Sequence, residues 1–301
     1  MSLLPVAAAV VGLVAGLWTR VLVVRHSVAE GEPPRRDCPH CGVPLPGPGR
    51  RGRTGGAGPR PAGESPGAGP ARTGRPSSPE RWRRLPWAGP LPAARCAGCS
   101  GRIGPPPLAV ELVTALALAA LALRAVPPSA RSGAVLAGRP SGPLPELASG
   151  TELAAYGWLA VVAVALVFVD AAVHRLPDRL TLAAYLGTAA LLTVTAVLAG
   201  RFDDLFRAGL GGLALAAFYL ALFLVNPAGM GLGDVKLAAV LGTALGWAGW
   251  ETLVAGAFLG FVAGGLYGVA LMVLRRAGRK SEIPFGPFMV AGAFAALLTA
   301  L

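Results

Sequence analysis

Charged residues are scarce in this chain: they make up 14% of its 301 residues, whereas hydrophobic residues make up 54%. This composition excludes an ordinary water-soluble globular domain and is typical of a protein that crosses a membrane several times. Histidine is rarer still, with three residues, and the four cysteines occur only as two pairs. No Ser–His or Cys–His nucleophilic pair is therefore apparent.

Acidic residues are also few, because 15 Asp and Glu stand against 27 Lys and Arg. Most of the resulting positive charge lies in residues 31–102, between apolar segments. A basic loop between membrane spans marks the cytoplasmic side of the membrane. We therefore expect the lipid bilayer, and no nucleic acid, to be the partner of this charge.

Apolar segments long enough to cross about 30 Å of hydrocarbon recur along the whole chain. They lie at about 4–24, 108–126, 153–170, 180–199, 207–225, 236–250, 252–274 and 285–301. The sequence predicts an all-α polytopic membrane protein with about eight transmembrane helices. If the basic loop is cytoplasmic, the alternation of spans places residues 171–179 and 227–235 on that side too.

The chain divides into three parts on this interpretation. Residues 1–25 form the first transmembrane helix, 26–107 a cytoplasmic loop with a small zinc-ribbon-like module, and 108–301 a transmembrane domain. Within the loop, residues 47–80 are rich in Gly, Pro, Arg and Ser and are expected to be a disordered insert, because they have too little apolar surface to offset the entropy of ordering. A shorter Pro/Ser/Gly linker is predicted over 127–150.

The cysteines stand in two C-x-x-C knuckles in the predicted loop, Cys38 with Cys41 and Cys96 with Cys99. Two such knuckles supply the four thiolates of a closed, tetrahedral structural zinc site. Disulfides and redox-active C-x-x-C motifs are the alternatives. A cytoplasmic position disfavours lasting disulfides, and no thioredoxin-like pattern surrounds the cysteines. His40 is expected to be a bystander within its knuckle.

Two aspartates lie where a membrane protein tolerates them least. Asp170 ends one apolar run, and Asp234 lies in the glycine-rich turn before another, GMGLGDVKL. Ionisable residues at such positions indicate function. Both fall at the predicted cytoplasmic edge, where neighbouring carboxylates would share one proton and could activate water for attack on a peptide carbonyl, as aspartic proteases do.

The residues around the two aspartates also have structural explanations. Asp178 follows Pro177 and fits the first turn of a helix. Gly231 and Gly233 allow tight backbone turns and close approach of another chain, so we expect them to support the site. Lys236 either extends to the membrane interface or pairs with an acid, and we count it among the supporting or substrate-binding residues.

These features together resemble the prepilin peptidase family, the aspartic G-x-G-D membrane proteases. Asp170 with LPDRLT (176–181) is similar to the first catalytic motif of the family, and GMGLGDVKL (229–237) is similar to the second. The segment IPFGPFMVAGA (283–293) resembles the closing segment of the family, and the cysteine pairs resemble the zinc motif of its longer members. The resemblance covers nearly the whole chain outside the insert.

The resemblance implies an aspartic endopeptidase of the inner (cytoplasmic) membrane, active in type IV pilus assembly and protein secretion. It would remove the leader of type IV pilin-like precursors on the cytoplasmic side. Longer members also methylate the new N-terminus with S-adenosylmethionine. Here GLWTRVLVVR (16–25) departs from the usual end of the first span, so methyltransferase activity stays open. The alternative is a non-enzymatic transporter or secretion/assembly component that carries a structural zinc module.

Overall fold

The structure, a computed structural model, describes residues 3–28, 32–43, 45, 95–96, 99–125, 143–227, 230–274 and 284–300. The predicted disordered insert, 47–80, lies outside these residues. The described residues form eight helices and no extended strand. The helices are α1 (Leu4–His26), α2 (Ala109–Ala125), α4 (Pro143–Val173), α5 (Asp178–Ala199), α6 (Phe202–Val225), α7 (Leu232–Ala248), α8 (Trp250–Val273) and α9 (Gly286–Ala300).

The all-α fold with about eight helices is confirmed, and five of the helices are long and apolar enough to cross a membrane: α1, α4, α5, α6 and α8. The prediction of a linker over 127–150 is wrong from Pro143 onward. There α4 begins, about ten residues before the span predicted at 153–170. Proline is tolerated in a first helical turn. The extension is held by tertiary contacts that local sequence does not reveal, among them the hydrogen bond between the Thr151 and Thr195 hydroxyls (2.8 Å).

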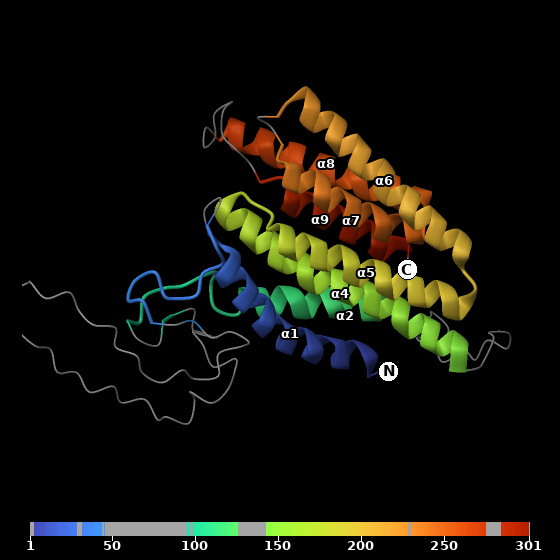
Figure 1. The fold of residues 1–301 in the computed structure, drawn as a ribbon, viewed down its shortest axis with the longest axis horizontal. Coiled ribbons are helices and arrows are strands. Elements are labelled where there is room, and N and C mark those ends of the chain that lie inside the picture. The colour runs from blue at the N-terminus through green and yellow to red at the C-terminus, as the bar shows by residue number, and fades with distance from the viewer. Residues whose placement is uncertain are drawn as a thin grey trace, which may run out of the picture.

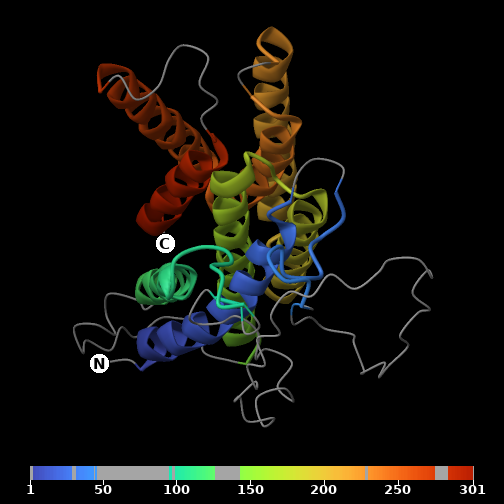
Figure 2. The same cartoon turned by 90° about the vertical axis from the view of Figure 1, so that its left-hand side faces the viewer.

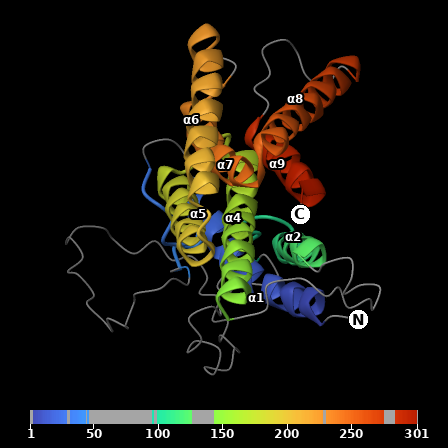
Figure 3. The same cartoon turned by 90° about the vertical axis from the view of Figure 1, so that its right-hand side faces the viewer.

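Consecutive helices pack as pairs: α1 with α2, α4 with α5, α6 with α7, and α8 with α9. The α4–α5 pair lies in the middle of the molecule, with α1 and α2 on one side of it and α6 to α9 on the other (Figures 1, 2 and 3). The cysteine-bearing segments extend from the end of the bundle at which α4 finishes and α5 begins, on the left in Figure 1.

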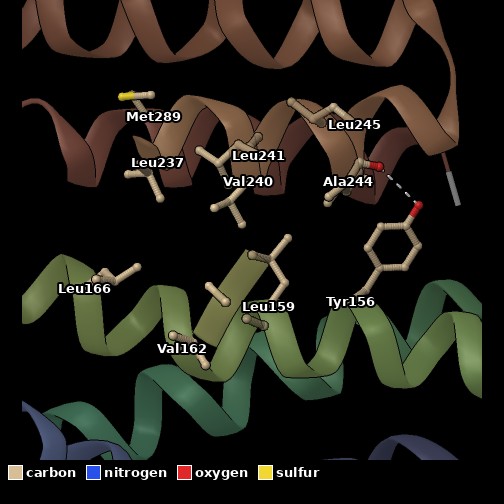
Figure 4. Close-up of a cluster of buried hydrophobic side chains, with 14 of the residues drawn as sticks. Tyr156, Leu159, Val162, Leu166, Leu237, Val240, Leu241, Ala244, Leu245 and Met289 are labelled. Carbon is tan, nitrogen blue, oxygen red and sulfur yellow. Dashed lines mark hydrogen bonds between the residues drawn. The ribbon is translucent and has the colours of Figure 1, made fainter. Parts of the chain in front are cut away.

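The core of the bundle forms where α4 faces α7. Tyr156, Leu159 and Leu166 of α4 point toward α7, with Leu237 and Leu241 opposite them, as Figure 4 shows. The Tyr156 hydroxyl crosses this interface to the backbone carbonyl of Ala244 at 3.5 Å. This apolar contact places the middle of α4 opposite α7.

Glycine permits a close helix contact between α6 and α7. A Cβ atom on Gly211 would lie 2.7 Å from the carbonyl oxygen of Gly242, and a Cβ on Gly242 would lie 2.5 Å from the carbonyl oxygen of Gly211. The two backbones therefore touch, as small residues allow in membrane helix pairs. Any larger residue at either position would push α6 and α7 apart.

The end of the bundle away from the cysteines is held by an ionic network. Glu152 of α4 accepts hydrogen bonds from Arg201 (2.9 Å) and from the indole of Trp247 at the end of α7 (2.8 Å). Arg201 also pairs with Asp204 and lies 4.7 Å from the centre of the Trp247 ring. Asp204 pairs with Arg207 (2.7 Å), which donates to backbone carbonyls at the end of α7. The network thus joins the ends of α4 and α7.

A buried ion pair joins α1 to α2. The Arg20 guanidinium forms two bonds of 2.6 Å to the Glu111 carboxylate, and both side chains are at most 3% exposed. The remaining Arg20 donors bind the carbonyl oxygens of Pro105 (2.9 Å) and Pro106 (2.8 Å). Arg20 therefore also anchors the segment that enters α2 after the second cysteine knuckle.

Removal of one partner of this pair is expected to be costly. Glu111→Leu leaves Arg20 buried and uncompensated, which should lower the free energy of unfolding by about 3–5 kcal/mol. Arg20→Met combined with Glu111→Leu should recover most of that loss, because an apolar pair needs no charge partner. Equilibrium unfolding in mixed detergent micelles measures both variants. An equal loss in the single and double variants would show that the pair itself is not responsible.

Candidate active site and metal centre

Asp170 lies in the last turn of α4 and is 4% exposed. Its Oδ2 accepts no hydrogen bond from the residues that the structure describes. The backbone amide of Gly286, at the start of α9, approaches the carboxylate, and a Cβ atom on Gly286 would lie 2.7 Å from Oδ2. A buried carboxylate oxygen without a partner is costly unless it holds a proton or binds water.

Asp234 occupies the first turn of α7 and is 8% exposed. The backbone N–H of Gly231 donates to its Oδ2 at 3.2 Å, which holds the carboxylate at the helix N-terminus. Gly233 brings α7 against the loop between α4 and α5, because a Cβ there would lie 3.0 Å from the Cβ of Leu176. Both predicted glycines thus lie where the backbone must come close to a neighbour or donate to the acid.

The two aspartates come together in space although 64 positions separate them in the sequence. Asp170 and Asp234 lie at the same end of the bundle, where Leu176 lies against both Gly233, next to Asp234, and Gly286, beside Asp170. Two neighbouring buried carboxylates cannot both be ionised cheaply, so the pair favours one shared proton. Such a pair can accept a proton from water at one acid and donate a proton from the other.

Lys236 reaches an acid rather than the carboxylate pair. Its Nζ lies 2.6 Å from Oδ1 of Asp178, the first residue of α5, and both side chains are more than half exposed. Asp178 therefore has the helix-start position predicted for it. An exposed pair of this kind contributes at most about 1 kcal/mol. Lys236 joins the starts of α5 and α7 next to the aspartates.

The four cysteines form one cluster. Their sulfur atoms all lie within 4.8 Å of one another, with 3.8 Å between Cys38 and Cys99 and 3.5 Å between Cys41 and Cys96. Four thiolates at about 2.3 Å from a tetrahedral zinc ion would be about 3.8 Å apart. All four cysteines are free of disulfides. The cluster thus has the donor set and the dimensions of a closed metal site.

The two knuckles share one backbone design. In the first, the N–H of Gly42 donates to the carbonyl of Cys38 at 2.9 Å, and in the second the N–H of Ser100 donates to the carbonyl of Cys96 at 2.9 Å. Gly42 and Ser100 both have positive φ, 68° and 56°. Each turn thereby brings its two sulfur atoms to the same side.

The pKa of the Cys41 thiol depends on the backbone and on the other thiols of the cluster. The Val43 backbone amide lowers the pKa of the Cys41 thiol, but desolvation and the three neighbouring thiols outweigh it and raise that pKa to about 12. A bound cation would reverse this balance, because a coordinating thiol is deprotonated outright. The predicted bystander, His40, directs its Nε2 to the carbonyl oxygen of Arg102 (3.3 Å).

Five membrane-length helices, with two buried aspartates at one end of the bundle, define a multi-pass membrane protein. Residues 157–269, which include both aspartates, match the type IV leader peptidase family. A prepilin leader peptidase/N-methyltransferase of Pseudomonas aeruginosa is 31% identical over 219 residues, which cover 72% of this chain and 67% of that protein. The chain belongs to the type IV leader peptidase family.

Two further relatives carry the same name. The protein of Aeromonas hydrophila is 33% identical over 205 residues, 68% of this chain and 62% of the relative, and that of Bacillus subtilis is 36% identical over 96 residues, 32% of this chain and 38% of the relative. The chain thus spans less than two thirds of the length of the Aeromonas protein. No solved structure matches it. These relatives do not favour the alternative of a transporter or assembly component.

Gly286 is a site residue that the sequence analysis does not identify. The sequence does point to its segment, because IPFGPF resembles the closing segment of the family. What the sequence did not reveal is that this segment starts α9 beside Asp170. The glycine leaves the room that the carboxylate occupies.

Gly286→Ala is expected to destabilise the protein by about 1–3 kcal/mol, because its Cβ would overlap Oδ2 of Asp170 and force a shift. Gly209→Ala in α6 is the matched control, since a Cβ there meets no atom within 4 Å. That change should stabilise the helix by roughly 0.5–1 kcal/mol. Unfolding of both variants in the same detergent tests the contrast, and a loss no greater in Gly286→Ala than in the control would disprove the steric account.

Proposed function

We propose that this chain is an aspartic endopeptidase that removes the leader of type IV prepilin-like precursors, with Asp170 and Asp234 as its catalytic pair. The observation that carries the proposal is the meeting of two buried carboxylates from α4 and α7 in a chain of the type IV leader peptidase family. The names of the relatives supply the substrate class.

The reaction follows from one proton shared by the pair. The ionised aspartate takes a proton from water, and the water oxygen bonds to the scissile carbonyl carbon. The protonated aspartate gives its proton to the carbonyl oxygen, which yields a neutral tetrahedral intermediate. As the C–N bond breaks, a proton passes to the leaving amine, and the new acid and amine are released. No covalent link to the enzyme forms.

Each of the two acids has one backbone donor beside it. Oδ2 of Asp234 accepts the N–H of Gly231, and the backbone amide of Gly286 approaches the Asp170 carboxylate. The mechanism requires one ionised and one protonated aspartate, and the two carboxylates titrate as a pair.

We further propose that the pair faces the cytoplasm from the inner membrane. Arg25 at the end of α1 lies at the same end of the bundle as the pair, and Arg175 and Arg179 flank the start of α5 at that end as well. Short loops rich in Arg and Lys remain on the cytoplasmic side. Precursors whose leaders enter from the cytoplasm would then reach the acids without crossing the bilayer.

Loss of either acid tests the mechanism. Asp170→Asn and Asp234→Asn keep the shape of the side chain but remove the acid/base group, so each should lower the rate of leader removal by about 10²–10⁴-fold. The measurement is cleavage of a co-expressed pilin-like precursor, followed by the mass of its N-terminus.

Asp203→Asn is the control for these changes. Asp203 is an exposed acid in the first turn of α6, at the end of the bundle away from the two aspartates. Its loss should leave cleavage within about threefold of the unmodified enzyme, because an exposed surface change away from the site has little effect. Full cleavage by both Asp170→Asn and Asp234→Asn would exclude the aspartic mechanism.

The cysteine cluster is proposed to hold one structural zinc ion through Cys38, Cys41, Cys96 and Cys99. The ion would keep the two knuckles together and leaves no open position for a substrate. On this view 26–107 is a separate cytoplasmic module, and the peptidase machinery belongs to 108–301.

The metal content of the purified chain tests this assignment. We expect about one zinc per chain, reduced to less than about half by Cys38→Ser or by Cys99→Ser, since zinc affinity depends on every thiolate. His40→Ala should retain the full content, because His40 lies in the knuckle but its ring nitrogen contacts a backbone carbonyl instead. If the chain purified under reducing conditions contains no zinc, the zinc proposal is refuted.

The N-methyltransferase named for the relatives is a second candidate activity, and S-adenosylmethionine would be its methyl donor. The same co-expression assay decides it. Addition of one methyl group to the new N-terminus would assign the activity to this chain, and a cleaved but unmethylated product would leave it a peptidase alone.

A further inference from the structure

Tyr219 of α6 is a polar side chain buried next to the carboxylate pair, and the mechanism above does not use it. The residue is 1% exposed and lies six residues before the end of α6 at Val225. That end of α6 leads into the turn that begins α7, so it is the end at which Asp234 lies. The phenol falls within electrostatic range of the Asp234 carboxylate.

The ring of Tyr219 is held on several sides by aromatic neighbours. It stacks on Phe261 of α8, with 5.5 Å between ring centres and 26° between planes, and it meets Phe218 edge-on at 5.7 Å. Phe285 lies 6.1 Å away on a third side. A ring packed in this way has a defined orientation, so the position of its hydroxyl is defined too.

One of these aromatic neighbours, Phe285, also lies close to Asp170 in the structure. Phe285 immediately precedes Gly286, whose backbone amide approaches the Asp170 carboxylate. Tyr219 therefore contacts the segment beside one acid while its phenol lies near the other.

The three rings around the Tyr219 phenol offer no strong hydrogen-bond acceptor. Buried tyrosines usually find a hydrogen-bond partner, because an unsatisfied hydroxyl in an apolar site is costly. At neutral pH a phenol keeps its proton, so the hydroxyl can donate a hydrogen bond to a group that arrives with the substrate.

We propose that Tyr219 is a third catalytic residue, whose hydroxyl donates a hydrogen bond to the oxygen of the scissile carbonyl as water adds to it. This inference rests on the proposed peptidase function and deepens it. The phenol does not transfer its proton. It stabilises the negative charge that develops on the oxygen before the protonated aspartate delivers its proton, in a site where such a bond is stronger than in water.

Tyr219→Phe tests this role, because it removes the hydroxyl and keeps the ring that packs on Phe261 and Phe285. With purified full-length enzyme in detergent and a pilin-like precursor, kcat should fall about 10²-fold while KM stays within about twofold, since the bond is made only in the transition state. The thermal unfolding temperature should be unchanged, as the ring contacts remain.

Tyr267→Phe is the matched control. Tyr267 lies in α8, is 47% exposed and packs on Phe288 at 5.1 Å, so it has the same chemistry at a position away from both acids. Its kcat should stay within about twofold of the unmodified enzyme. A loss of about tenfold or more in kcat, confined to Tyr219→Phe, supports the proposal, and any smaller loss, or an equal loss in both variants, overturns it.

The aspartate variants separate this proposal from the function on which it rests. If Asp170→Asn and Asp234→Asn still cleave the precursor, the aspartic mechanism fails, whatever Tyr219→Phe does. If both are inactive and Tyr219→Phe is fully active, the mechanism stands and only the role of Tyr219 is rejected.

Discussion

Carboxylates at the edge of a membrane can be kept out of lipid only where helix backbones come close enough to enclose them, and the arrangement of this bundle depends on that constraint. Asp170 and Asp234 are both less than 10% exposed. Gly286 brings α9 onto the first acid, and Gly233 brings α7 onto the loop that follows it. Because glycine has no side chain, the end of α4 and the starts of α7 and α9 can converge around the two acids.

The two helices that carry the acids are also held at their far ends. There, Glu152 of α4 binds the indole of Trp247 of α7, and Arg201 joins both residues. Between the ends, apolar side chains of α4 face those of α7. These contacts thus fix the position of α4 relative to α7 between Glu152 and the acids, and preorganised acid/base chemistry requires such fixed positions.

Sequence reasoning succeeded where the pattern is local. Apolar runs predicted eight helices, because a membrane span must be continuous and satisfy its own backbone. The C-x-x-C knuckles predicted the sulfur cluster, since each pair is set by a single turn. Sequence reasoning failed where contacts between distant segments determine the structure. The start of α4 at Pro143, the place of Gly286 and the burial of Tyr219 all depend on segments distant in sequence, which composition and periodicity do not reveal.

The division of the fold around α4 separates the carboxylate pair from the cysteine cluster. The helices α1 and α2 pack on each other and on α4, and the cluster packs on Val24 at the end of α1. The acids lie on the other side, among α4, α7 and α9. Arg20 and Glu111 fasten the cluster to α1 and α2 but contact neither acid. Since α2 also packs on α9, whose first residue lies beside Asp170, changes in the N-terminal part can reach the acids through α4 or through α9.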